Sequence, residues 1–432
     1  MSQVKIAVIG AGSFVFGPGV LKGVLREQRL PGVRLALMDV RAEPVELMAA
    51  VGRRMAAEAG LDTAVSAHTD RAEALDGADF VFCCAAPEMA RRFRMDVDIA
   101  ARHDPGHVIT EFGGIAGISY SLRQIAFIES LAADMKRLCP SAWLFNVANP
   151  LPRVCQAAHQ LGVPTVGFCY VYLGGYSMLW RVFHGEGLAY PFAAAPEKWL
   201  VTTAGLNHFS WVLALRDRAT GADLLGELRD RLAAGATSGE PHADEIFRKT
   251  GYLLAIHDGH SQDFLPPHPS AASHEAIWHG SPEERRARQD LLADVARGAE
   301  PAEKVTANTS WEKPVDLVAA MAYGKPIEFP ALNLANRGQI GNLPAGVFVE
   351  TPCTAGSDGP APRTLTLPET VEPYCRRTAE VTDTIVRAAL RRNRALVHRA
   401  VELDPTITDK PAGLAALDEC LAAHADRIGD YT

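Results

Sequence analysis

The sequence of 432 residues predicts an α/β protein, with a doubly wound parallel sheet first and an α+β region after it. Three observations predict this class. Apolar strand patterns alternate with helical periodicity through residues 1–168. A glycine-rich turn links the first strand pattern to the first helical pattern. After residue 174 the alternation gives way to paired strand patterns and long helical ones, which is typical of an α+β arrangement.

Residues 1–168 carry the strands of the predicted parallel sheet. Apolar runs predict strands at residues 4–9, 35–38, 80–84, 108–109, 143–147 and 165–168. Apolar side chains at helical spacing predict the helix between the first two strands, and they include Val20, Leu21, Val24 and Leu25. Because helical patterns separate the strands, consecutive strands can run parallel with helices as their crossovers.

Residues 169–432 form the predicted second domain, which follows the first without a low-complexity linker. Strand patterns fall at residues 199–204 and 211–215, helical patterns near 223–234, 242–255, 369–403 and 411–425, and a sheet or extended pattern at 332–351. The stretch 266–310 is rich in Pro, Ser, Ala and charge, and it predicts a loop with a solvated helix.

Composition and charge limit the kinds of molecule that the chain is expected to bind. The chain is 48% hydrophobic and 22% charged, with a formal net charge of −8. A negative chain is a poor ligand for nucleic acid or an anionic membrane. The sequence shows no signal-peptide pattern and no apolar run of the ~18 residues that span a bilayer. Its eight cysteines lack the spacing of a disulfide framework, so we expect free thiols and a cytoplasmic location.

A candidate dinucleotide site follows the first strand. Gly10, Gly12 and Ser13 form a tight turn that lets the backbone approach a pyrophosphate at a helix N-terminus. The third position of the G-x-G-x-x-G pattern is Val15, but Asp39 ends the second strand, where an acid binds a ribose diol. The arrangement predicts a Rossmann-like domain with NAD preferred over NADP, because the acid repels a 2′-phosphate. A purely structural glycine turn is the alternative.

A second polar group gathers at the ends of later strands. Asn149 and Cys169 follow two strands of the predicted parallel sheet, and Asn207 and His208 interrupt a strand pair. The carboxyl ends of parallel strands are where ligands bind. A thiolate together with an imidazole can hold a divalent metal. A buried, inert cysteine beside a packed histidine is the alternative on spacing alone.

These motifs together resemble those of glycoside hydrolase family 4, the NAD- and divalent-metal-dependent glycosidases, across nearly the whole chain. The matching stretches are KIAVIGAGS at 5–13, NVANP at 146–150, GFC at 167–169, GLNHFSW at 205–211 and NRGQIGNLP at 336–344. The segment DGHSQDFLP at 258–266 is similar to the Gly-Asp-Arg-His-x-x-Glu-Phe-Leu-Pro motif of the α-galacturonidase and α-galactosidase branch. Five motifs in order are far more specific than any one of them.

The resemblance implies a Rossmann-like domain followed by an α+β domain of the lactate/malate dehydrogenase-like type. The second domain would hold the substrate, the metal and the contacts of a homodimer or homotetramer. The implied reaction oxidises the sugar at C3 with NAD, removes the C2 proton, eliminates the aglycone, adds water and returns the hydride. The implied substrate is a small glycoside, namely an α-galacturonide, an α-galactoside or a related acidic sugar.

Roles carry over by position within the matching motifs. Cys169 and His208 match the metal ligands, with Mn²⁺ the expected ion, and Asp258 matches the proposed C2 base. Glu111 falls where the family carries a candidate acid for the leaving group. The residues expected near the sugar are Asn149, Asn207, Tyr170 and His260.

Each of these roles has a structural alternative. Asp258 could be a solvated loop residue, Glu111 a helix-start acid favoured by the helix dipole, and His260 a packed side chain. The sequence also departs from the family at two positions near the sugar. Tyr170 replaces a common histidine, and Gly259 replaces the arginine of the Asp-Arg-His motif.

Two other functions compete with the glycosidase hypothesis. An NAD-dependent dehydrogenase of a hydroxy acid or a sugar would share the fold, but it leaves Cys169 and His208 unexplained. Such an enzyme would accumulate NADH, whereas a glycosidase of this family recycles its cofactor. A non-catalytic NAD-binding sensor would be inert on a panel of glycosides supplied with NAD and manganese.

Overall fold

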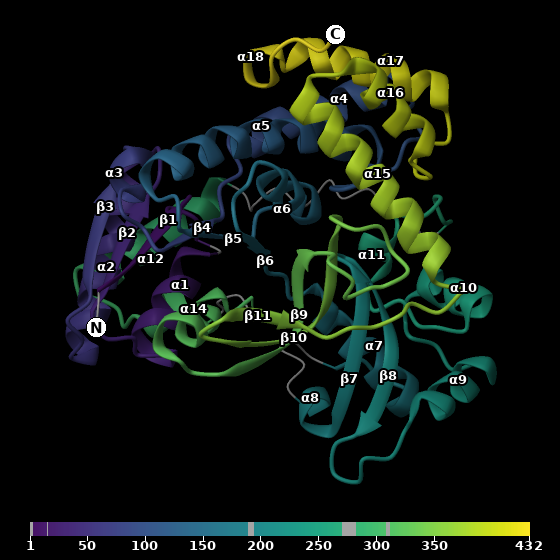
Figure 1. Ribbon diagram of the computed structural model, residues 1–432, viewed down its shortest axis with the longest axis horizontal. Coiled ribbons are helices and arrows are strands. Elements are labelled where there is room, and N and C mark those ends of the chain that lie inside the picture. Colours follow the sequence, from purple (N-terminus) through teal and green to yellow (C-terminus); the bar gives the residue numbers. More distant parts are fainter. Residues whose placement is uncertain (1–2, 15, 189–193, 270–281, 308–311) are drawn as a thin grey trace.

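The computed structural model describes residues 3–14, 16–188, 194–269, 282–307 and 312–432 (Figure 1). Within these residues an eleven-stranded sheet has the order β3-β2-β1-β4-β5-β6-β9-β10-β7-β8, and β11 pairs with β10. The strands are β1 (Val4–Ile9), β2 (Val33–Met38), β3 (Ala64–His68), β4 (Phe80–Cys83), β5 (Trp143–Asn146), β6 (Thr165–Gly167), β7 (Trp199–Leu206), β8 (Phe209–Asp217), β9 (Ile327–Ala335), β10 (Phe348–Gly356) and β11 (Gly359–Pro362).

Strands β1 to β6 form the parallel half of the sheet. Val4 lies opposite Val33 on β2, and Ile6 lies opposite Phe80 on β4. The order 3-2-1-4-5-6 is that of the Rossmann fold, with its switch point between β1 and β4. Buried apolar side chains fill β1, β2 and β4, as expected of strands that are covered on both faces. The predicted doubly wound parallel sheet is therefore confirmed.

Helices cover both faces of this half (Figure 1). One apolar core contains side chains of α1 (Gly17–Lys22), the π-helical turn η1 (Gly23–Glu27), α2 (Ala42–Ala59), α12 (Pro282–Ala296) and α14 (Pro314–Tyr323). The other contains side chains of α4 (Met89–His103), α5 (Gly114–Leu138), α6 (Leu151–Gln160), α15 (Glu372–Arg391), α16 (Arg394–Leu403) and α17 (Lys410–Ala423). Both cores therefore draw on the C-terminal part of the chain.

The hairpin of β7 and β8 organises a third core. Its large side chains include Trp199, Phe209 and Trp211, all fully buried. The surrounding helices are α7 (Gly174–His184), α8 (Ala194–Lys198), α9 (Leu225–Ala233) and α10 (Pro241–Thr250). The remaining short helices are α3 (Arg71–Leu75), η2 (Val171–Leu173), α11 (Asp258–Ser261), α13 (Glu303–Thr306) and α18 (Ala425–Ile428).

The sheet continues across the domain boundary expected at residue 168. Strand β6 pairs antiparallel with β9 through Gly167 and Asn333. A Cβ at Gly167 would lie 2.5 Å from Leu151 and 3.0 Å from Asn333, so only glycine allows this close approach. Because the two parts share one sheet, they share packing as well, and the division into residues 1–168 and 169–432 stays a prediction.

The structure differs from the predicted elements in a few places. The strand predicted at residues 108–109 is wrong, because that segment is a loop between α4 and α5. Strand β4 already pairs with β1 and β5, so no sheet edge is open to it there. Strand β3 escaped prediction because it is a half-exposed edge strand without a clear apolar pattern. The helix predicted to residue 255 ends at Thr250, since Gly251 takes a left-handed φ of 74°. Among the described residues, no helix has the length and apolarity needed to span a bilayer.

Candidate active site

The glycine turn and the acid of the second strand are in direct contact. The N–H of Gly12 donates to Asp39 Oδ2 at 3.1 Å, and the N–H of Ser13 donates to the Gly10 carbonyl at 3.0 Å. Gly10 has a φ of 91°, and a Cβ there would lie 2.9 Å from the backbone of Ala85. A Cβ at Gly12 would lie 2.7 Å from Asp39 Oδ2. Both glycines are therefore needed to form a cradle at the carboxyl edge of β1.

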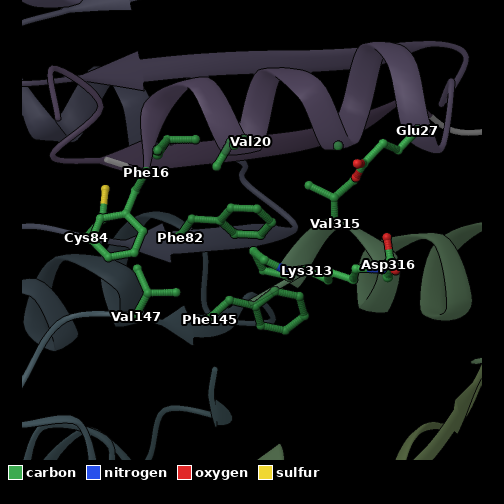
Figure 2. A pocket seen from close by; sticks show the side chains of 14 residues that line it. Phe16, Val20, Glu27, Phe82, Cys84, Phe145, Val147, Lys313, Val315 and Asp316 are labelled. Carbon is green, nitrogen blue, oxygen red and sulfur yellow. The ribbon is translucent and has the colours of Figure 1, made fainter. Parts of the chain in front are cut away.

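An apolar pocket lies beside this cradle (Figure 2). Phe82 on β4 and Phe145 on β5 extend between the α1 helix and the start of α14. Cys84 lines the same pocket, and its thiol donates to the carbonyls of Ile9 and Gly10 at 3.3 Å each. Cys84 thus lines the pocket and also contacts Gly10 of the glycine turn.

Cys169 and His208 meet although they belong to different parts of the sheet. Cys169 follows β6, and His208 lies in the tight turn between β7 and β8 with a left-handed φ of 58°. The Sγ of Cys169 is 3.2 Å from His208 Nε2. Burial, reinforced by the negative charge of Glu350, raises the pKa of the Cys169 thiol. Without a metal the thiol keeps its proton, and a bound divalent ion would have to displace it.

Asn207 is held by a buried carboxyl group behind it. Its Nδ2 donates to Glu350 Oε2 at 3.1 Å, and Glu350 also accepts from Ser210 and from Asn333 at 2.6 and 3.0 Å. Burial raises the pKa of Glu350. The Oδ1 of Asn207 is buried and has no hydrogen-bond partner among the described residues. An unsatisfied buried acceptor is costly, and a hydroxyl group that reached this oxygen would satisfy it.

Glu111 and Asn149 form a second contact of predicted residues. The Nδ2 of Asn149 donates to Glu111 Oε2 at 3.0 Å. Burial raises the pKa of the Glu111 carboxyl to about 7, and the negative charge of Asp263 acts in the same direction. A carboxyl group with such a pKa is protonated below about pH 7 and is still partly protonated at neutral pH, which is what a general acid requires.

His260 lies beside His208 and is held by a residue that the sequence reasoning missed. The two imidazole rings have centroids 4.5 Å apart, and His260 Nδ1 is 3.2 Å from Asp263 Oδ2. The other oxygen of Asp263 accepts from the N–H of Phe112 at 2.9 Å. A His-x-x-Asp spacing puts both side chains on one face of a helical turn, and this signal could have identified Asp263.

Asp258 makes contacts that its expected role did not anticipate. Its carboxylate accepts from the backbone N–H groups of His242 and Ala243 at 2.7 and 3.0 Å, in the first turn of α10. Its own N–H donates to Glu240 at 2.7 Å. These contacts anchor α10, and the role of Asp258 as a base stays a prediction. Tyr170, 37% exposed, immediately precedes the short helix η2.

Two protein-family models match most of this chain. Residues 5–184 match the model of the family 4 glycosyl hydrolases, and residues 203–407 match the model of their C-terminal domain. The chain belongs to glycosyl hydrolase family 4. The resemblance inferred from the motifs is therefore confirmed.

Relatives of this family 4 chain include an α-galactosidase and an α-galacturonidase, both of Bacillus subtilis. The first is 26% identical over 447 residues and covers 99% of each chain. The second is 26% identical over 438 residues and covers 94% of each. A solved 6-phospho-α-glucosidase from gut microorganisms, in complex with NAD and Mn²⁺, superimposes with a TM-score of 0.79 at 22% identity over 100% of both chains. These relatives support the predicted branch, and the structure supports the fold.

Proposed function

We propose that this family 4 chain is an NAD- and divalent-metal-dependent glycosidase that acts on an α-galacturonide, an α-galactoside or a related acidic sugar. The observation that carries the proposal is the 3.2 Å contact between Cys169 Sγ and His208 Nε2. A thiol beside an imidazole is a donor pair for a metal, and glycosidases that use two carboxylates have no need of one. The α-galactosidase and α-galacturonidase relatives support the choice of sugar.

The glycine cradle fits NAD. A Cβ at Gly12 would collide with Asp39, so only glycine lets the turn and this acid approach each other as they do in dinucleotide-binding folds. We propose that Gly10, Gly12 and Ser13 hold the pyrophosphate and that Asp39 binds the ribose diol. The solved relative that contains NAD and Mn²⁺ supports both cofactors. When bound, NAD accepts and later returns the C3 hydride, and the divalent ion stabilises negative charge on the sugar oxygens.

The protein's own side chains would orient the sugar and move its protons. The Oδ1 of Asn207 accepts a sugar hydroxyl, and Asn149 positions a second hydroxyl beside Glu111. The proposed base, Asp258, takes the proton from C2. As the bond between C1 and the leaving oxygen breaks, Glu111 donates its proton to that oxygen. The resulting carboxylate can then activate the water that adds to C1.

The proposed mechanism is tested by isotope exchange. The enzyme is supplied with NAD, Mn²⁺ and a reductant, and it hydrolyses aryl α-galacturonide and α-galactoside in deuterated water. Deprotonation at C2 predicts deuterium at C2 of the released sugar, and substrate deuterated at C3 should react more slowly. Normal hydrolysis without C2 deuterium at every pH would exclude the mechanism.

A further inference from the structure

The surroundings of His208 offer more metal donors than the pair of Cys169 and His208. Beyond the thiol, His208 contacts His260, and His260 is paired with Asp263. One ligand atom from each of His208, His260 and Asp263 lies within 4.8 Å of the others. The cluster is buried or nearly so, with Asp263 only 2% exposed.

Two pair distances around His208 and His260 match the edges of a coordination polyhedron. Metal bonds to nitrogen and oxygen are about 2.1 Å long and those to sulfur about 2.3 Å, so neighbouring ligands lie about 3.0–3.6 Å apart. The Cys169–His208 pair and the His260–Asp263 pair are each separated by 3.2 Å. Opposite ligands of an octahedral ion lie about 4.2 Å apart, and the ligand atoms of His208, His260 and Asp263 lie within 4.8 Å of one another. Cys169 is not part of this group of three, and it is joined to the group through its contact with His208.

The carboxylate of Asp263 is held in one orientation. Its Oδ1 accepts from the Phe112 N–H, which leaves Oδ2 directed at His260. Hydrogen bonds of this kind fix the orientation of metal-ligating carboxylates. Phe112 follows Glu111 directly, so the contact between Asp263 and the Phe112 N–H connects the segment that carries Glu111 to the proposed metal ligands.

We propose that His260 and Asp263 ligate the divalent ion together with Cys169 and His208. This inference rests on the metal dependence in the proposed function and adds two ligands to it. Two imidazoles and one carboxylate are a donor set for divalent first-row metals, and one thiolate adds a fourth ligand. A six-coordinate ion held by these four side chains would keep two positions for oxygen atoms of the sugar, which is the contact that the proposed function requires.

Cobalt(II) provides a direct test, because its visible spectrum reports the donor set. Purified protein, stripped of metal and kept reduced, is titrated with Co²⁺ in the absence of NAD and sugar. The wild type should show ligand-field bands together with a thiolate-to-cobalt charge-transfer band. Asp263→Asn and His260→Gln should keep the charge-transfer band and shift the ligand-field bands at saturation. Each should bind Co²⁺ at least about 10–100-fold more weakly, the loss caused even by removing a group that only orients a ligand.

Two further variants complete the design. Cys169→Ser should lose the charge-transfer band and still bind Co²⁺ through the other three ligands. His257→Gln is the matched control, because it removes a histidine three positions before His260, and its titration should equal that of the wild type. Asp263→Glu restores a carboxylate and should recover part of the affinity, provided that circular dichroism shows each variant to be folded.

The outcomes separate this inference from the proposed function. Unchanged ligand-field bands at saturation in both Asp263→Asn and His260→Gln would overturn the ligand role, whatever their affinities. No Co²⁺ or Mn²⁺ binding by the wild type would overturn the metal dependence as well. Metal binding as described, without C2 exchange during hydrolysis, would leave the ligand set standing and remove the mechanism.

Discussion

The glycine cradle proposed for NAD and the side-chain cluster proposed for the metal ion lie at the same sheet but are built in different ways. The cradle comes from one βαβ unit, in which Gly10, Gly12 and Asp39 are brought together by local geometry. The metal cluster needs Cys169 after β6, His208 in a hairpin turn, and His260 and Asp263 in and just after a short helix. Local motifs tolerate change elsewhere in the fold, whereas an assembled cluster depends on how several segments pack.

The largest effect is expected at the metal pair. Cys169→Ser and His208→Ala should each abolish hydrolysis with little loss of folding. An ion that is lost, or held by an altered donor set away from the sugar oxygens, no longer stabilises their charge, which costs several kcal/mol, or roughly 10³-fold or more in rate. Chelation should remove activity and Mn²⁺ should restore it. Full turnover after exhaustive chelation, with no metal by elemental analysis, would contradict the metal role.

Substitution of Asp258 tests whether this residue both anchors α10 and acts as the base that removes the C2 proton. Asp258→Asn should lose C2 exchange together with hydrolysis, since an amide cannot accept the proton, while NAD binding survives. The free energy of unfolding should fall by about 0.5–2 kcal/mol, because the first turn of α10 loses a charged acceptor. Wild-type exchange in a variant destabilised by this amount would assign Asp258 to the α10 anchor alone.

The pKa of Glu111 predicts how the rate of hydrolysis depends on pH. Its folded pKa of about 7 lies above its ordinary value, so the proton-donating form prevails below pH 7 and is lost as the pH rises through it. Turnover of substrates with poor leaving groups should fall accordingly. In Glu111→Gln, we expect the rate of hydrolysis to drop by about 10²–10⁴-fold. We also expect the fall in rate on the alkaline side of the pH profile to disappear. Rates measured with a series of aryl leaving groups provide the check, and an unchanged alkaline limb would exclude Glu111 as the acid.

The smallest effect is expected in the cradle. Asp39→Ala removes a charge-assisted hydrogen bond to the ribose, which contributes about 1.5–3 kcal/mol, or roughly 10–100-fold in NAD affinity. Calorimetry with NAD measures this directly, and Co²⁺ affinity serves as the internal control because the metal cluster is separate. Unchanged NAD affinity would show that Asp39 does not bind the diol.

Pairing geometry explains why some elements could be predicted and others could not. Continuous apolar runs such as residues 4–9 belong to strands covered on both faces, and they are visible in any window of sequence. The edge strand β3 has a mixed pattern, and the apolar pair at 108–109 has no strand beside it. A short run becomes a strand only when a sheet edge is free to receive it.

Local sequence was enough to predict the glycine cradle, the parallel half of the sheet and the residue types suited to a metal, because each depends on neighbours within one or two elements. Three contacts depend on the packing of distant segments: Cys169 with His208, Asn207 with Glu350, and Asp258 with the first turn of α10. The tertiary structure also brought Asp263 to His260 and to the loop after Glu111. These contacts join segments that are distant in the chain or in separate elements, and their distances follow from how the shared sheet and its cores pack.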